Sequence, residues 1–225
     1  MLKGITIAID GPAAAGKSTI AKKIAQKLQY TYIDTGAMYR ALTYKAIQSG
    51  IDMDSDEALA DLLVNTEILL IPDNGGQAVH VDGVDCSNEI RSQEVTAAVS
   101  KVAAHSTVRK MMVDKQRKLA YGTGVVMDGR DIGTEVLPDA DLKIFMTASV
   151  DERAERRFQE NEKRGIHSSL DRLKEEIEKR DRADSEREVS PLKKAEDAIL
   201  VDTTSMSIDE VVDKVIKLAE ERMEQ

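Results

Sequence analysis

Short apolar runs alternate along the chain with longer stretches in which apolar residues recur every three or four positions. Ile20, Ile24 and Leu28 form one such amphipathic face. The short runs predict strands near 4–10, 32–34, 124–128, 142–146 and 198–201. The longer stretches predict helices over 17–28, 37–48, 56–64, 93–104, 106–120, 151–163 and 168–182, with a last helix near the C-terminus. Strands alternating with helices at this spacing predict an α/β fold, in which helices cover both faces of a parallel sheet.

Residues 66–86 depart from this alternation. Two apolar runs, 68–71 and 78–81, are separated by an Asn-Gly-Gly turn at 74–76. A second turn, Asp82-Gly83, leads into a third short extended segment. Strands joined by such tight turns form antiparallel hairpins. Because hairpins do not belong to a parallel α/β layer, we interpret about 65–90 as an inserted small β-containing subdomain.

Composition excludes several classes of protein. The 225 residues are 41% hydrophobic, as is usual for one globular domain or one domain with a small satellite. A net charge of −9 argues against broad binding to nucleic acid or to an anionic membrane. The single Cys86 excludes an internal disulfide. No long apolar run or signal-like N-terminus is present, so we expect a cytoplasmic chain, and nothing requires more than a monomer.

Residues 11–18 read GPAAAGKS and match the phosphate-binding pattern G-x-x-x-x-G-K-[ST] at every fixed position. A predicted strand precedes the match and an amphipathic helix follows it, which is the context this loop requires. Small residues let successive backbone N–H groups point at a phosphate, and Lys17 adds a full positive charge. The Ser18 hydroxyl is suited to Mg²⁺. The candidate ATP-binding residues are Gly11, Pro12, Ala13, Ala14, Ala15, Gly16, Lys17, Ser18 and Thr19.

The loop predicts binding of a nucleoside triphosphate but does not choose among a GTPase, an ATPase module and a small-molecule kinase. The guanine-reading pattern N-K-x-D is absent, and the D-x-x-G match at 73–76 falls in the predicted hairpin turn. Two clusters favour the kinase. Arg40 lies one turn into the helix after a strand end, where a guanidinium can bind the phosphate of an acceptor. Arg130 and Asp131 follow another strand end. The alternative for each cluster is a solvent-exposed cap or a structural ion pair.

Arginines are concentrated late in the chain. Of the 14, eight lie between residues 150 and 190. Arg180, Asp184 and Arg187 share one helical face, provided that the helix continues that far. A run of charges is commonly a solvated face, and that alternative explains the neighbouring Glu and Lys residues. The phosphate loop and the two strand-end clusters favour a catalytic role, since phosphoryl transfer needs several cations around the migrating group.

Six segments together resemble bacterial cytidylate kinases over essentially the whole chain. They are the phosphate loop, IDTGAMYR (33–40), SNEIRSQEV (87–95), VSKVAAHSTVR (99–109), MDGRDIGT (127–134) and KRDRADSERE (179–188). The resemblance implies a P-loop NTPase-type three-layer fold with a five-stranded parallel sheet, an acceptor-binding subdomain and a short helical lid. The implied core is 1–36 and 98–225, with a lid at about 155–185. The implied CMP-binding region is 37–97.

The resemblance also implies an activity, which is transfer of the ATP γ-phosphoryl group to CMP or dCMP with Mg²⁺. Ser100, Arg109 and Asp131 would read the cytosine edge, and Arg40, Arg130 and Arg187 would hold the CMP phosphate. Arg180 and Asp184 would lie at the sugar and between the nucleotides, Thr35 would line the CMP site, and Arg157 and Arg164 would belong to the lid. The implied catalytic set is Lys17, Arg130, Arg157, Arg180 and Arg187.

Several alternatives stay open on the residues alone. A kinase for UMP or AMP is the nearest rival, and a nucleotide-binding regulatory module without transfer chemistry is the rival from another class. A carboxylate such as Asp131 favours cytosine, because it accepts a hydrogen bond from the 4-amino group and repels the carbonyl of uracil. Either Asp10 or Asp128 is placed to assist Mg²⁺ through water. No histidine is required, since the oxygen of the acceptor phosphate is already ionised near neutral pH.

Overall fold

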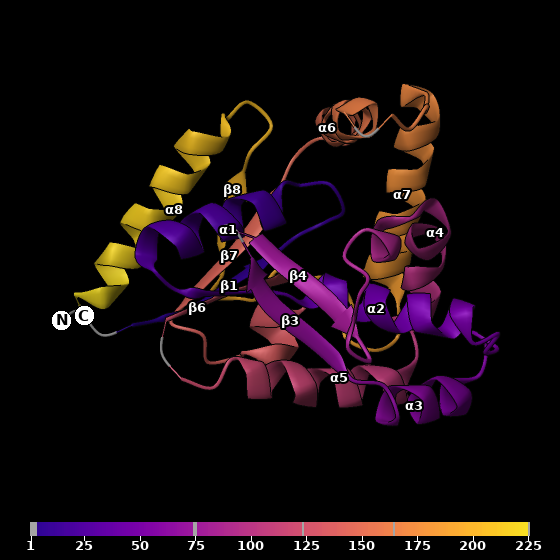
Figure 1. Ribbon diagram of the computed structural model, residues 1–225. Helices are drawn as coiled ribbons and strands as arrows, with labels where there is room; N and C mark the ends of the chain where they lie inside the picture. Colours follow the sequence, from indigo (N-terminus) through magenta and orange to yellow (C-terminus); the bar gives the residue numbers. More distant parts are fainter. Residues whose placement is uncertain (1–3, 74–75, 123, 164, 225) are drawn as a thin grey trace.

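The computed structural model describes residues 4–73, 76–122, 124–163 and 165–224. Its larger sheet has five parallel strands in the order β2-β6-β1-β7-β8, which confirms the predicted sheet (Figure 1). The strands are β1 (Thr6–Asp10), β2 (Thr31–Asp34), β6 (Val125–Gly129), β7 (Leu142–Thr147) and β8 (Ile199–Asp202). Parallel pairing brings the carboxyl ends of all five strands to one edge of the sheet.

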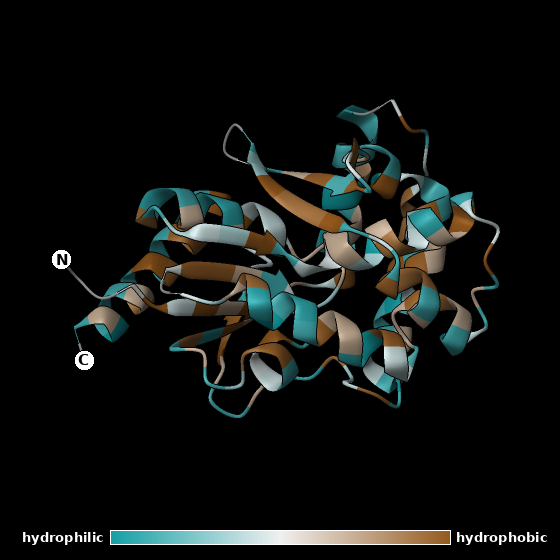
Figure 2. Ribbon diagram, turned by 60° about the horizontal axis from the view of Figure 1, so that its bottom comes forward, coloured by the Kyte–Doolittle hydropathy of each residue, from teal (hydrophilic) through white to brown (hydrophobic). Residues whose placement is uncertain are grey.

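Helices cover both faces of this sheet. On one face, α1 (Lys17–Leu28) and α8 (Ile208–Met223) pack on Ile7 and Ile9 of the central strand. On the other face of the sheet, Ala8 and Met127 pack together against helix α5 (Ser106–Leu119). The apolar strands lie inside while polar residues colour much of the outer surface of the helices (Figure 2). Among the described residues, no helix is long and apolar enough to cross a membrane.

The remaining helices form two further groups. The first consists of α2 (Thr35–Gln48), α3 (Asp56–Val64) and α4 (Gln93–Val102), with a 3₁₀ turn at Glu89–Arg91. Leu42 and Leu63 are fully buried in a second core between these helices and α5. The helices α6 (Val150–Lys163) and α7 (Leu170–Glu186) pack on each other beside the phosphate loop. A π-helical turn, Ile132–Val136, follows β6 and was not predicted.

A second sheet confirms the predicted hairpin and third strand. The strands β3 (Ile68–Asp73), β4 (Gly76–Val81) and β5 (Val84–Asp85) pair antiparallel, while Asn74 and Gly75 of the predicted turn lie outside the described residues. The Gln77 side chain attaches this sheet to the edge strand β2. Its Oε1 accepts from Asp34 N–H at 3.0 Å and its Nε2 donates to the Tyr32 carbonyl at 2.7 Å. Backbone groups of an edge strand are thereby satisfied by a side chain.

Helix α7 is longer than the predicted 168–182, because it continues to Glu186. Leu173 and Ile177 bury one face of it against α6, which stabilises a segment whose composition is strongly charged. Arg180 and Asp184 are therefore helical, as their shared face requires. Arg187 is the residue that caps the helix, with extended backbone (φ −62°, ψ 142°), so its side chain departs from the helical direction.

Candidate active site

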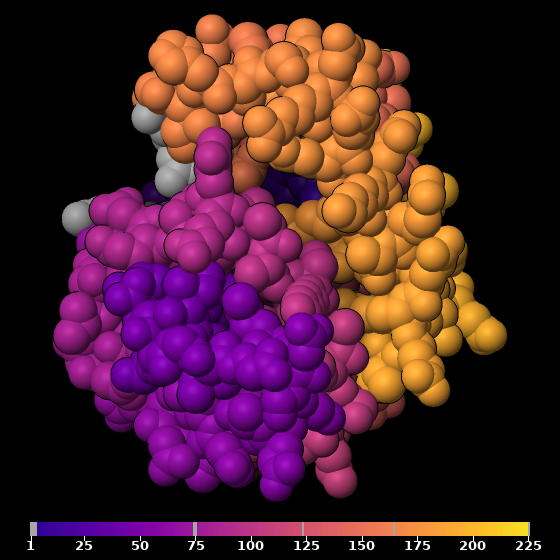
Figure 3. Space-filling model, turned by 90° about the vertical axis from the view of Figure 1, so that its right-hand side faces the viewer, coloured from indigo at the N-terminus to yellow at the C-terminus, as the bar shows by residue number. Residues whose placement is uncertain are grey.

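A cleft of about 1060 Å³ opens at the carboxyl ends of the strands. The phosphate loop, the start of α2, the segment after β6 and helices α4, α6 and α7 all contribute to its walls. Figure 3 shows the hollow between the orange segment that contains α6 and α7 and the magenta segment below it, with indigo N-terminal atoms visible inside it. This is the edge of an open α/β sheet at which ligands bind.

The phosphate loop has the backbone that an anion-binding loop needs. Gly11 has a φ of 148°, and a Cβ there would lie 2.1 Å from the Met146 carbonyl oxygen of β7, so only glycine fits. Gly16 has a left-handed φ of 86° where the loop enters α1. Amide N–H groups at a helix start favour phosphate through their partial positive charge. The loop is therefore held against the sheet and opens into the cleft.

Lys17 is buried at the start of α1. Its Nζ donates to the Pro12 carbonyl at 2.7 Å, so it closes the loop on itself. Burial, reinforced by the positive charge of Arg130, lowers the pKa of Lys17 to about 7. A bound polyanion would restore the charged form, since an opposite charge raises the pKa of an amine.

Asp128, at the end of β6, faces the phosphate loop. It accepts hydrogen bonds from the Ser18 hydroxyl at 2.9 Å and from the Tyr32 hydroxyl at 2.7 Å. Burial and the nearby charge of Asp34 raise the pKa of Asp128 to about 6. The Asp10 carboxylate does not bond to the phosphate loop, because its two oxygens accept hydrogen bonds from the N–H groups of Ile132 and Gly133, both at 2.8 Å. Burial raises the pKa of Asp10 to about 6 as well.

The side-chain oxygens of Ser18 and Asp128 are candidates for holding the Mg²⁺ that the sequence predicts. Hydroxyl and carboxylate oxygens are hard ligands of the kind that Mg²⁺ takes, and the Ser18–Asp128 contact places one of each in the cleft. No group of three or more His, Cys, Asp or Glu side chains able to hold a metal occurs in the described ranges. The donor set fits a cation that is bound largely by nucleotide phosphates and water, with Ser18 beside it.

The start of α2 holds the first acceptor-side cluster. Asp34 caps the helix by accepting the Ala37 N–H at 2.8 Å, and it also binds Arg40 at 3.0 Å. Arg91 approaches the same carboxylate at 3.7 Å. Two guanidinium groups beside one carboxylate lower the pKa of Asp34, although burial opposes them. Thr35 is fixed by donating to the Asp128 carbonyl at 2.7 Å. Because two guanidinium groups stand beside one carboxylate, the cluster has an excess of positive charge at the cleft.

The expected cytosine-reading residues also lie together. Arg109 is fully buried, forms an ion pair with Asp131, and lies 5.5 Å from the centre of the Tyr39 ring. Arg187 reaches the other Asp131 oxygen at 3.7 Å. Ser100 of α4 lines the same cleft. The three residues predicted to read the base thus come together from three different segments, namely α4, α5 and the residues after β6.

Arg130 and Arg180 occupy the middle of the cleft. Arg130 Nε donates to Asp184 at 2.8 Å, and the positive charges around Asp184 lower its pKa, although burial opposes them. Burial and the charge of Arg130 lower the pKa of Arg180 to about 10. In the described part of the chain, the buried Nε atoms of Arg180 and Arg40 have no hydrogen-bond partner. Buried guanidinium groups without enough acceptors point to an anionic ligand.

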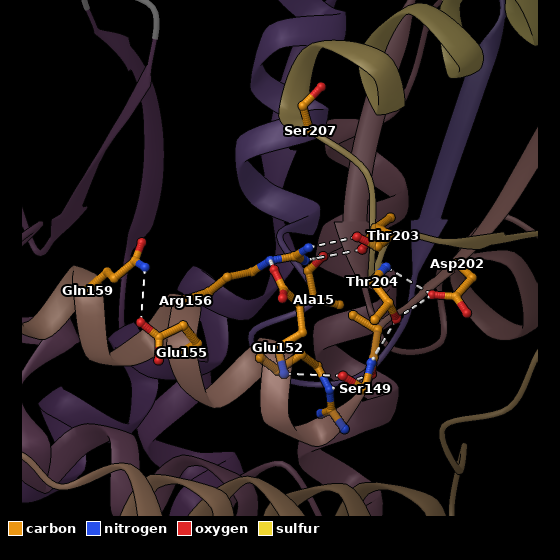
Figure 4. A network of polar contacts seen from close by, with 12 residues as sticks. Ala15, Ser149, Glu152, Glu155, Arg156, Gln159, Asp202, Thr203, Thr204 and Ser207 are labelled. Carbon is orange, nitrogen blue, oxygen red and sulfur yellow. Dashed lines mark hydrogen bonds and ion pairs between the residues drawn. The ribbon is translucent and has the colours of Figure 1, made fainter.

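Helix α6 contributes Arg157, which lines the cleft and pairs with Glu160 at 3.6 Å, whereas Arg164, also expected in the lid, lies outside the described residues. Gly165 has a φ of 69°, the conformation of a helix-ending glycine. Sequence reasoning missed Arg156, which binds the Thr203 carbonyl at 2.8 Å and the Thr203 hydroxyl at 3.1 Å (Figure 4). The sequence does not distinguish Arg156 from the other arginines of this charged helix, because its contact with the segment after β8 forms only in the folded chain.

Comparisons with known proteins agree with this geometry. The family model described as cytidylate kinase matches residues 7–221. A curated cytidylate kinase from Lysinibacillus sphaericus is 60% identical over 99% of this chain and 100% of its own length. One from Bacillus subtilis is 56% identical over 99% of both chains. A crystal structure of an uncharacterized protein from Eubacterium ventriosum has the same fold, with a TM-score of 0.52 and 15% identity over 96% of this chain and 98% of that one. The chain therefore belongs to the cytidylate kinase family.

Proposed function

We propose that this kinase transfers the γ-phosphoryl group of ATP directly to the phosphate of CMP or dCMP, giving ADP and CDP or dCDP. The observation that carries the proposal is the group of cations at the centre of the cleft. Burial and the positive charge of Arg130 lower the pKa of Arg180 to about 10, and within the described residues the buried Nε of Arg180 has no hydrogen-bond partner. Phosphoryl transfer gathers negative charge at such a point.

The donor nucleotide fits the side of the cleft formed by the phosphate loop. Lys17 and the loop amides would bind its β- and γ-phosphates, and Thr19 lies at the start of the following helix. Arg156, with Met206 and Ser207 after β8, forms the wall next to this end of the cleft. This wall supports binding of the ATP base, because a guanidinium face and apolar side chains suit an aromatic ring.

Mg²⁺ with the triphosphate would neutralise developing negative charge, and Ser18 is the protein oxygen best placed to hold it. Asp128 orients the Ser18 hydroxyl through their hydrogen bond. We assign assistance to Asp128 rather than Asp10, since both Asp10 oxygens are occupied by backbone N–H groups. The metal site is thus proposed at the junction of the loop with β6.

The acceptor nucleotide fits the opposite side. Arg40, Arg130 and Arg187 would bind its phosphate, while Asp131 with Arg109 and Ser100 would read the cytosine edge. Asp131 is already oriented by its two arginine partners, which supports a fixed hydrogen bond to the 4-amino group. Arg180 and Asp184 would lie at the sugar and between the nucleotides. No general base is needed, so the protein contributes alignment and charge.

We further propose that 37–97 is the CMP-binding region and that 1–36 with 98–225 is the core, in which about 155–185 acts as a lid. Closure of the lid over the cleft would exclude water and so limit ATP hydrolysis. Arg157, on the lid, would then approach the transferred group. We propose a cytoplasmic monomer whose partners are these small substrates alone.

An ADP-release assay with ATP and Mg²⁺ tests the function against its rivals. CMP, dCMP, UMP, AMP and GMP are supplied in turn as acceptors. We expect CMP and dCMP to give the highest kcat/KM. A preference for UMP or AMP would instead assign the chain to a different monophosphate, and failure of all five acceptors to stimulate ADP release would favour a regulatory nucleotide-binding module.

A further inference from the structure

A buried arginine outside the proposed catalytic set is bonded to the phosphate loop. Arg153, on α6, is 4% exposed. Its Nε donates to the Ala148 carbonyl at 3.0 Å and its Nη1 donates to the Ala13 carbonyl at 3.0 Å. The same Nη1 lies 2.6 Å from Asp181 of α7. A cation is rarely so buried unless its hydrogen bonds and charge are satisfied, and here they are satisfied by the loop and by α7.

Asp181 binds the other polar group of the same loop residue. Its Oδ1 accepts from the Ala13 N–H at 3.4 Å, while its Oδ2 pairs with Arg153. Both the carbonyl and the N–H of Ala13 are therefore bonded to side chains, one from α6 and one from α7. The loop cannot shift at Ala13 without breaking these contacts or moving the two helices with it.

The next residue is held by apolar packing. Ala14 has a left-handed φ of 58°, a backbone conformation that residues other than glycine adopt rarely. Its methyl group packs against a cluster that α6 and α7 form between them, including Ala154, Leu173 and Ile177. A strained backbone conformation persists only where its surroundings determine it. At Ala14 the surroundings are the two helices of the lid.

Helix α7 also reaches the acceptor side. Arg180 directly precedes Asp181 on α7, and Asp184, one turn further, pairs with Arg130 at 2.8 Å. An acceptor phosphate that binds Arg130 and Arg180 therefore acts on a helix that also contacts the phosphate loop. The path from one nucleotide to the other is short, because Asp181 lies between Arg180 and Asp184 on α7 and bonds to Ala13.

We propose that Arg153 and Asp181 are positioning residues that link the phosphate loop to the lid helices, so that a nucleoside monophosphate bound at the acceptor side tightens the loop around a nucleoside triphosphate. This inference rests on the proposed function, since it takes CMP as the acceptor. Neither residue lines the cleft. They act through the backbone of Ala13 and the conformation of Ala14.

Binding of a non-hydrolysable ATP analogue, measured by calorimetry with and without saturating CMP, tests the link. In the unaltered chain we expect CMP to tighten analogue binding by about fivefold or more, a usual size for coupling between sites. In Asp181→Ala the ratio should fall to within about twofold of unity, because the helix is no longer bonded to the loop. Arg172→Ala is the matched control, since Arg172 lies on the same helix in an exposed ion pair with Glu176. The control should keep the full ratio.

A ratio near unity in the unaltered chain overturns the proposal, as does a full ratio in Asp181→Ala. Asp181→Asn is the second variant, because it keeps an oxygen for the Ala13 N–H while removing the charge that pairs with Arg153. It should retain folding if Asp181→Ala does not, and its ratio should be intermediate. A full ratio in Asp181→Asn would count against a role for the ion pair.

Hydrogen exchange of the peptide 11–18 separates this inference from the proposed function. Without any nucleotide, the loop amides of Asp181→Ala should exchange several-fold faster than those of the unaltered chain and of Arg172→Ala, while peptides of the central sheet stay unchanged. If the chain binds no CMP, the proposed function fails, yet faster loop exchange would still establish the attachment. Unchanged loop exchange overturns the attachment itself.

Discussion

The Ser18 hydroxyl donates a 2.9 Å hydrogen bond to the Asp128 carboxylate, joining the helix after the phosphate loop to the end of β6. Tyr32 donates to the other Asp128 oxygen at 2.7 Å, so the carboxylate is fixed from one helix and one neighbouring strand. Asp10, which stands at the end of the adjacent strand, is instead used by the backbone of 132–133. Two aspartates at neighbouring strand ends thus have different tasks, and substitutions can separate them.

For Asp128→Asn we expect the Mg²⁺ concentration for half-maximal activity to rise by roughly 10-fold or more, the usual effect of losing an outer-sphere carboxylate. Because the pKa is raised from 3.8 to about 6, ionisation of Asp128 lowers the stability of the folded state between these two pH values, and that cost is fully present above pH 6. The neutral amide should therefore cost little stability.

Asp10→Asn is the matched control. Its single acceptor oxygen leaves one backbone N–H unpaired, so the free energy of unfolding in urea should fall by about 1–3 kcal/mol. Its Mg²⁺ requirement should not change, and an altered requirement there would contradict the assignment.

Removal of the Lys17 amine should impair turnover strongly. In Lys17→Ala we expect kcat to fall by roughly 10²–10³, the usual cost of losing a preorganised charge next to the transferred group. Steady-state kinetics with CMP varied at saturating ATP measures the effect. Lys23→Ala is the control, because Lys23 lies on the same helix in an exposed pair with Asp209. Near-normal turnover of Lys17→Ala would remove the residue from the catalytic set.

Triphosphate binding should be linked to proton uptake at alkaline pH. Because the pKa of Lys17 is about 7, its amine is mostly neutral at pH 8 in the free protein. Phosphate oxygens raise that pKa, so binding of MgATP at pH 8 should take up roughly one proton. Asp128, with a pKa of about 6, is ionised at pH 8 before and after binding and adds nothing. Calorimetry in buffers of different ionisation enthalpy measures the uptake. Binding heats that do not depend on the buffer would contradict a neutral Lys17.

Substitution of Asp131 should change which base is accepted. In Asp131→Asn we expect the ratio of kcat/KM for CMP to that for UMP to fall by about 10-fold or more, because an amide no longer repels the uracil carbonyl. The KM for ATP should change less, since Asp131 lies in the cluster of Arg109 and Arg187, on the acceptor side. An unchanged CMP-to-UMP ratio would exclude Asp131 from reading the base.

Local patterns in the sequence are enough to predict most of the elements. The helix Lys17–Leu28 and the hairpin strands arise from short-range periodicity and turn residues, which act over a few positions. The end of α7 could not be predicted in this way. Its charged sequence has weak amphipathic character beyond 182, and the helix is held by burial against α6 and by the Asp184–Arg130 pair.

The candidate site likewise contains residues that local sequence predicts and residues whose roles depend on tertiary contacts. The phosphate loop is contiguous, so its spacing alone predicts that Gly11 to Ser18 bind a triphosphate. The roles of Asp10 and Asp128 depend on which groups lie next to each oxygen, and those groups are separated by more than a hundred positions. Arg156 and Arg153 are two of several arginines in one helix, and only burial and contact distinguish them.

Local patterns along the chain are therefore enough to predict the α/β layering, the inserted hairpin and the phosphate loop, and the resemblance to a family adds the expected acceptor residues. Which charged side chains are paired with one another is visible only in the folded chain. Hydrogen bonding and Coulomb attraction between side chains depend on separations of a few ångströms in space, which the order of residues does not specify. Residues such as Ala13, Arg153 and Asp181 come within that range only when the chain has folded.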